Sequence, residues 1–112
     1  MFDVKYKIWL DKDGKAFGQG PYVLLNGVKE KGSLSEAAKS YGISYNKAHT
    51  LIKSIEKKLG FPLIIRKTGG AHGGGSELTK EAEELMSRYS MFYSSCEKAI
   101  NEIFDSYFHD YK

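Results

Sequence analysis

The middle third of the chain twice places a serine able to cap a helix ahead of an amphipathic run and a glycine. Ser33 and Glu36 have the S-x-x-E spacing of a capping box, in which each side chain can accept a hydrogen bond from the other residue's backbone N–H. Gly42 suits the left-handed position that ends a helix, and Ser44 can cap the next one. The spacing therefore predicts two helices in close succession, the second running to about Leu59.

The second of these helices has one apolar and one polar face. Its apolar residues form a single helical stripe: Ala48, Leu51, Ile52, Ile55 and Leu59. Its polar face carries groups that can bond base edges or phosphates: Tyr45, Asn46, Lys47, His49, Thr50 and Lys53. Ala37 and Ala38 are small enough to let the preceding helix approach closely. The pattern predicts a helix-turn-helix whose second helix fits the DNA major groove, although an ordinary solvated face has a similar composition.

A glycine-rich segment follows, between two short apolar runs. Leu63–Ile65 leads as a strand into Arg66 and Lys67, and Glu77–Leu78 returns as a second strand. The glycines between them predict a flexible hairpin tip, or wing, over residues 68–76, which can approach the DNA backbone or the minor groove. The alternative is a loop with no role. Outside the second helix, the predicted DNA contacts are Ser33, Ser35, Ser44, Arg66, Lys67, Thr68, Gly69, Gly70 and His72. No Gly-Lys-Ser/Thr occurs, so the segment is not a nucleotide-phosphate loop.

Two further elements are expected ahead of the helix-turn-helix. Alternation of apolar with other residues predicts a strand over Val4–Leu10, followed by an Asp-Lys-Asp-Gly turn and a second short strand near Lys15–Gly18. Pro21 suits the first turn of a helix, which ends at Gly32. The apolar face of this helix is marked by Leu24, Leu25 and Val28.

From Thr79 onward the pattern predicts one long helix. Apolar residues recur at spacings of four and three from Leu78 to Ile103, which is a heptad seam. About 30 residues would extend roughly 45 Å, more than the preceding domain can cover, so pairing with a second copy is expected. The predicted dimer contacts are Leu85, Tyr89, Phe92, Tyr93, Cys96, Ala99, Ile100, Ile103 and Phe104. The alternative is a helix that ends early or folds back.

Charge is distributed unevenly along the chain. Residues 31–80 carry nine Lys and Arg against three Glu, whereas residues 81–112 carry three against seven Asp and Glu. The basic block coincides with the helix-turn-helix and wing, which favours a polyanionic partner over a plain lysine surface. A rival reading makes the long aromatic helix a protein-interaction module with the helix-turn-helix as scaffold.

The remaining chemistry argues against an enzyme. The histidines (His49, His72 and His109) and the single cysteine, Cys96, lack metal-ligand spacing, so neither a metal nor a cofactor is expected. No catalytic arrangement is visible, and Glu56 and Glu77 have no evident partner. One cysteine, no membrane-length apolar run and no signal-like N-terminus predict a cytoplasmic protein.

Several stretches resemble known regulators. Those similar to the DNA-binding domain of LysR-type regulators are Ser33-Leu34-Ser35-Glu36-Ala37-Ala38, Gly42-Ile43-Ser44-Tyr45 and Ile55-Glu56-Lys57-Lys58-Leu59-Gly60-Phe61-Pro62-Leu63. The spacing T-G-G-x-x-G-G-G-x-x-L-T over residues 68–79 resembles, more narrowly, the N-terminal domain of molybdate-responsive ModE regulators. The resemblance covers most of residues 4–90, and the N-terminal strand and turn are similar to single-domain members.

This resemblance implies a transcription regulator that binds a palindromic operator in double-stranded DNA as a homodimer. The expected fold is mainly α with a small β component: a winged helix-turn-helix with N-terminal strands, a β-hairpin wing and a long C-terminal dimerisation helix. Residues 1–78 would form the DNA-binding domain, and residues 79–112 the dimerisation helix of the same unit. In two-domain relatives molybdate binds a separate C-terminal domain; none is expected here, no effector is evident, and regulation by molybdate stays open.

Overall fold

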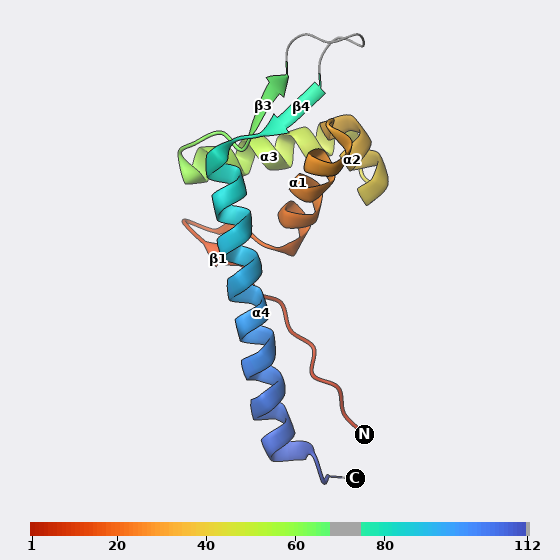
Figure 1. Ribbon diagram of the computed structural model, residues 1–112, viewed down its shortest axis with the longest axis vertical. Helices are drawn as coiled ribbons and strands as arrows, with labels where there is room; N and C mark the ends of the chain where they lie inside the picture. The colour runs from red at the N-terminus through yellow and green to blue at the C-terminus, as the bar shows by residue number, and fades with distance from the viewer. Residues whose placement is uncertain (68–74, 112) are drawn as a thin grey trace.

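The computed structural model describes residues 1–67 and 75–111, which form a head and one long projecting helix (Figure 1). In chain order the elements are β1 (Leu10–Asp11), β2 (Lys15–Phe17), α1 (Gln19–Lys31), α2 (Leu34–Tyr41), α3 (Tyr45–Leu59), β3 (Ile64–Lys67), β4 (Gly75–Leu78) and α4 (Lys80–Phe108). The strands form two antiparallel pairs, β1–β2 and β3–β4. The predicted fold, a mainly α winged helix-turn-helix, is confirmed. No helix in the described ranges is long and apolar enough to cross a membrane.

The helix boundaries follow the caps expected from the sequence. The Ser33 and Ser44 hydroxyls accept from the backbone N–H of Glu36 (3.0 Å) and Lys47 (3.1 Å). Gly42 ends α2 with a φ of 83°, a conformation that favours glycine. These contacts are local in sequence, which is why their residues identify them.

The head's core is formed by one face of each of its helices. Gly27 of α1 faces Ala37 of α2 so closely that a Cβ on Gly27 would lie 2.9 Å from the Ala37 Cβ. Small residues at this crossing therefore set the separation of α1 and α2. The buried helix residues of the head are Pro21, Leu24, Leu25, Val28, Leu34, Ala37, Ala38, Ala48, Ile52 and Ile55.

The strand predicted over Val4–Leu10 is wrong over most of its length, because β1 comprises only Leu10–Asp11. Residues 1–9, which we call the N-terminal arm, descend instead alongside α4, and both termini lie at the same end of the molecule (Figure 1). Alternate arm residues are half-buried, as the pattern required. Alternation reports burial of one face, and an extended segment lying on a helix produces it without a neighbouring strand.

Aromatic contacts hold the arm against α4. The Phe2 ring lies 5.5 Å from that of Phe108, and the Tyr6 ring lies 6.2 Å from that of Tyr93 (centroid distances). The Tyr6 hydroxyl donates to the Glu97 carboxylate at 3.3 Å. Desolvation and the Glu97 charge raise the pKa of Tyr6, so this hydroxyl is protonated at neutral pH.

The upper part of α4 completes the core of the head. Tyr89 is 1% exposed and its ring meets Phe17 edge-on, at 5.3 Å between centroids. Its hydroxyl donates to the Ile8 carbonyl oxygen at 2.7 Å, and burial raises the pKa of Tyr89, which keeps the donor protonated. The sequence placed Tyr89 in the dimer seam. The structure buries it within its own chain, since a heptad pattern does not say which partner covers it.

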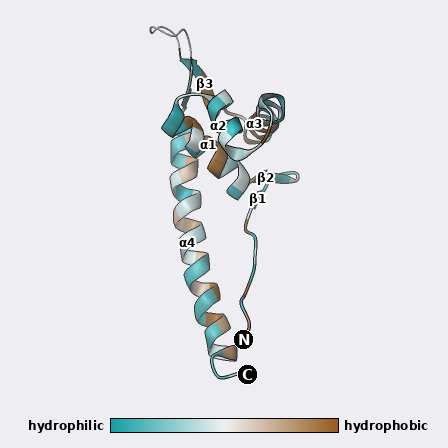
Figure 2. Cartoon of the chain, turned by 90° about the vertical axis from the view of Figure 1, so that its right-hand side faces the viewer, coloured by the Kyte–Doolittle hydropathy of each residue, from teal (hydrophilic) through white to brown (hydrophobic). Residues whose placement is uncertain are grey.

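Below Tyr89 the helix is covered much less. Met91 is 67% exposed, Phe92 48% and Ile103 60%. Hydrophobic stretches occur on α4 well away from the head (Figure 2). The projecting part of α4 therefore presents apolar side chains that the described chain does not bury.

Candidate nucleic-acid interface

The outer face of α3 carries the polar residues that the sequence assigned to it. Tyr45, Asn46, Lys47, His49, Thr50 and Lys53 are all exposed. The rings of Tyr45 and His49 stack with their centroids 5.8 Å apart. The Lys53 ammonium forms a salt bridge with the Glu56 carboxylate of the same helix, at 3.2 Å. The amino-terminal half of α3 is thus a continuous polar surface available to a ligand.

A hollow of about 250 Å³ lies beside the start of α3 and joins three separate segments. We call it the wing-base hollow; it is lined by Ser33, Leu34, Ser35, Tyr45, Arg66, Gly75 and Ser76. It brings Ser33 and Ser35 at the start of α2 together with Tyr45 of α3 and Arg66 of β3. A helix N-terminus and an exposed arginine both favour an anion, and four hydroxyls can add hydrogen bonds.

The base of the wing is fixed by backbone contacts to the head. Ser76 N donates to the Gly32 carbonyl oxygen (2.8 Å), and Thr79 N donates to that of Leu63 (3.0 Å). A Cβ on Gly75 would lie 2.6 Å from the Gly32 oxygen, so this position requires glycine. The β3–β4 register pairs Arg66 with Ser76, which aligns Arg66 with the hollow. The base of the wing is therefore held in a defined position against the head.

Sequence reasoning found some of these residues and missed others. Ser33, Ser35, Tyr45 and Arg66 meet at the hollow, and Lys67 is exposed at the end of β3. Thr68, Gly69, Gly70 and His72 lie outside the described residues. Gly75 and Ser76 fall within the predicted wing, residues 68–76, but were not predicted as individual contacts. Ser76 follows the glycine run directly, and its pairing with Arg66 could be found only by fixing the hairpin register.

Glu56, for which the sequence offered no partner, has a structural role. Its carboxylate accepts from the backbone N–H of Leu63 (2.7 Å) and Ile64 (3.3 Å). The side chain is 10% exposed. Glu56 thereby joins the last turns of α3 to the start of β3, and so connects the recognition-helix candidate to the wing.

We expect Glu56→Ala to lower the free energy of unfolding by about 2–3 kcal/mol, because hydrogen bonds to a charged acceptor are lost and backbone donors are left unpaired. Urea titration followed by circular dichroism measures this. Lys53→Ala is the control and should cost less than about 1 kcal/mol, since the Lys53 side chain is 60% exposed and its loss leaves both backbone hydrogen bonds of Glu56 in place. Equal effects of the two substitutions would contradict the assigned role of Glu56.

Packed short helices, an exposed polar helix face and a two-stranded wing define a winged helix-turn-helix protein. Residues 22–83 match the family described as bacterial regulatory helix-turn-helix proteins of the lysR family. The match begins in α1 and ends in the first turn of α4. The chain belongs to this family.

Curated relatives agree with that assignment. The transcriptional regulator ModE of Haemophilus influenzae is 35% identical over 82 residues, which cover 73% of this chain and 32% of the relative. The molybdenum-pterin-binding protein MopB of Rhodobacter capsulatus is 31% identical over 99 residues, covering 82% of this chain and 37% of the relative. The chain thus spans about a third of the length of these relatives.

The fold is also that of solved LysR-type domains. A complex of the CbnR DNA-binding domain with DNA superposes with a TM-score of 0.60 at 20% identity, covering 77% of this chain and 93% of that one. DarR of Vibrio fischeri in complex with DNA has a TM-score of 0.57 at 18% identity, covering 78% of this chain and 28% of that one. At these identities the likeness establishes the fold.

Proposed function

We propose that the chain binds double-stranded DNA as a transcription regulator, with α3 in the major groove and the wing on the adjacent backbone. The wing-base hollow is the observation that carries this proposal. It places an arginine and hydroxyls beside the exposed amino-terminal end of α3, where they would face the DNA backbone if α3 enters the major groove. CbnR and DarR, which have the same fold, have been solved in complex with DNA, and this supports DNA as the partner.

Within this arrangement the contacts divide into two kinds. Asn46, Lys47 and Thr50 project from the start of α3 and would meet base edges, because the first turns of a recognition helix enter the groove most deeply. Ser33, Ser35 and Arg66 line the wing-base hollow and would bind phosphate. Lys67, beside the hollow, would add a phosphate contact that does not depend on sequence.

We further propose that residues 1–78 are the DNA-binding unit and that α4, within residues 79–112, pairs two copies across a palindromic operator. An α-helix turns about 100° per residue, which places Phe92, Cys96, Ala99 and Ile103 on one narrow stripe. Tyr93, Ile100 and Phe104, also predicted as dimer contacts, are half-buried on the flank that the arm follows. The proposed seam is therefore the stripe, with Leu85 at its upper end.

DNA binding is expected to weaken steeply with salt, because each phosphate contact releases counterions. Fluorescence anisotropy with a labelled duplex pool of random sequence, titrated across a salt series, measures the slope. Absence of binding even at low salt would overturn the proposal.

Substitutions should separate the two kinds of contact. Lys47→Ala should cost about 1–3 kcal/mol on the preferred sequence and relax selection at one position, whereas Lys67→Ala should weaken all sequences alike and reduce the salt slope by about 1. Selection from the random pool followed by anisotropy gives both values. Lys12→Ala, on the exposed β1–β2 turn, is the charge-matched control and should change neither. Identical behaviour of the Lys47 and Lys67 variants would refute the assigned roles.

A further inference from the structure

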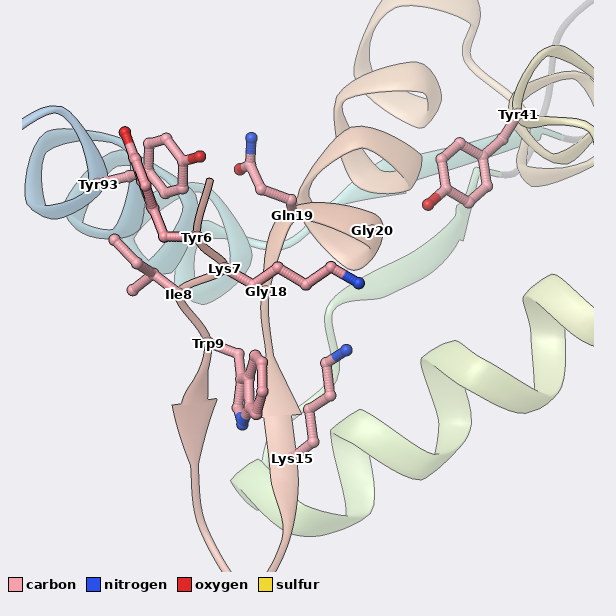
Figure 3. Close-up of a pocket in the computed structure, with 10 residues that line it drawn as sticks. All are labelled: Tyr6, Lys7, Ile8, Trp9, Lys15, Gly18, Gln19, Gly20, Tyr41 and Tyr93. Atoms are coloured by element: carbon pink, nitrogen blue, oxygen red, sulfur yellow. The ribbon is translucent and has the colours of Figure 1, made fainter. Parts of the chain in front are cut away.

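A second cavity, of about 260 Å³, lies on the arm side of the head and takes no part in the proposed DNA contacts (Figure 3). Its walls come from the arm, β2, the start of α1, the end of α2 and α4. The side chains that matter here are Tyr6, Lys7, Trp9, Lys15, Tyr41 and Tyr93. The first 20 residues, the end of α2 and the middle of α4 thus line one space.

The polar lining of this cavity is basic. Lys7 and Lys15 contribute to it, and no described lining residue carries a carboxylate. The two side chains extend toward the same space, between Trp9 and Tyr41 (Figure 3). Neither lysine forms a salt bridge within the ranges that the structure describes. Two lysines that line one cavity and have no carboxylate in its lining favour a bound anion.

The rest of the lining is aromatic. The Lys15 ammonium lies 5.1 Å from the centroid of the Trp9 ring, and Tyr6, Tyr41 and Tyr93 add further rings. Glycine at position 20 leaves room here, because a Cβ there would lie 3.0 Å from the Tyr41 hydroxyl. Flat aromatic walls select flat ligands.

We propose that this cavity binds a small planar anion, a carboxylate carried on an aromatic or heteroaromatic ring. The ring would lie among the aromatic side chains and the carboxylate would accept hydrogen bonds from Lys7 and Lys15. The volume suits a single ring with its substituent. The cavity is thus the site of an effector within the helix-turn-helix unit itself.

The cavity lies between the two parts of the chain that the proposed DNA-binding dimer uses, the head and α4. Tyr41 is the last residue of α2, and Tyr93 lies on α4 next to the proposed seam. The Lys15 carbonyl oxygen accepts from Lys58 Nζ of α3 at 3.4 Å. A ligand between these elements changes the angle at which two heads are held, and therefore their affinity for paired half-sites. This coupling rests on the proposed DNA binding, whereas occupancy of the cavity does not.

Trp9 reports occupancy directly, because it is the chain's single tryptophan. Its indole N–H gives one peak in a ¹H–¹⁵N correlation spectrum of the full chain. Titration with nicotinate and with 4-hydroxybenzoate should shift this peak saturably for at least one of them. The neutral isosteres, nicotinamide and 4-hydroxybenzamide, should bind about tenfold more weakly or worse, since they lack the charge.

Variants identify the cations. Lys7→Gln together with Lys15→Gln should weaken binding of the carboxylate by about tenfold or more, whereas Lys5→Gln, on the same arm but outside the cavity, should change it less than about twofold. No saturable shift with either carboxylate below about 10 mM would overturn the site. Equal binding of acid and amide, or insensitivity to the double substitution, would overturn the anionic class.

The proposed effect of the ligand on DNA binding is tested by a separate measurement. A carboxylate that binds should change the anisotropy-measured affinity for duplex DNA, and DNA should change the carboxylate affinity by the same factor. A saturable Trp9 shift with unchanged DNA affinity would refute the effector role while leaving the site intact. If the protein binds no DNA at all, the Trp9 titration still decides whether the site exists.

Discussion

Replacing Tyr89 with alanine is expected to remove about 3–5 kcal/mol from the free energy of unfolding. Tyr89 is among the largest fully buried side chains, and its ring contacts Phe17 and Tyr22 at centroid distances of 5.3 and 5.9 Å. Truncation leaves a cavity between α4 and the head, where the surrounding helices cannot close in. Total stability for a domain of this size is about 5–15 kcal/mol, so much of it would be lost. Urea or thermal unfolding followed by circular dichroism measures the change.

A milder substitution separates packing from the hydrogen bond. Tyr89→Phe keeps the ring and removes the donor to the Ile8 carbonyl, so it should cost about 1 kcal/mol and loosen the N-terminal arm. Hydrogen exchange over residues 2–9 reports the loosening. Tyr22→Phe is the matched control, because the structure shows no hydrogen bond from the Tyr22 hydroxyl among the described residues, and it should leave the arm unchanged. A Tyr89→Ala protein as stable as Tyr22→Phe would show that Tyr89 is not in the core.

The parts of the fold that the sequence predicted are those determined by near neighbours. Ser33, Gly42 and Ser44 act on backbone groups within four residues of themselves, so their spacing locates α2 and α3. The polar face of α3 followed from helical periodicity alone. Ser33, Ser35 and Arg66 could be named as candidates, but not brought together, because their meeting depends on the β3–β4 register and on how Gly75 packs on Gly32.

The predictions for Tyr89 and the N-terminal arm were wrong for one reason. Periodicity indicates that a face is buried, but it does not identify the partner that covers it. The heptad line assigned Tyr89 to a second chain, while the structure covers it with Phe17 and Ile8 of its own. Alternation in the arm predicted a strand, while the covering surface is α4. Glu56 had no visible partner in the sequence because its donors are the backbone N–H groups of Leu63 and Ile64. These groups come close to its carboxylate only once the chain turns at Gly60.

Because a heptad pattern does not identify the covering partner, the proposed pairing of two α4 helices needs a direct test. The double substitution Phe92→Asp with Ile103→Asp provides it. These side chains are 48% and 60% exposed and lie within about 20° of each other around α4. Two carboxylates on each helix would face their counterparts across a seam and leave buried, unpaired charges, which an apolar interface does not tolerate. Sedimentation should show a dimer for the wild type and a monomer for the double variant.

The consequence for DNA follows from effective concentration. In a dimer, binding of one head holds the second near its half-site, which can strengthen binding by about 10²–10⁴-fold without a new contact. The double variant should lose an amount in this range on a palindromic site and about half of the salt slope, while its affinity for an isolated half-site stays the same. Ser94→Asp with Asn101→Asp adds the same charges about 180° around the helix and should leave the dimer intact. A wild-type monomer at high micromolar concentration would overturn the proposed dimer, whereas a double variant that still dimerises would place the contact between copies elsewhere. Either result would leave the stripe on α4 to another protein partner.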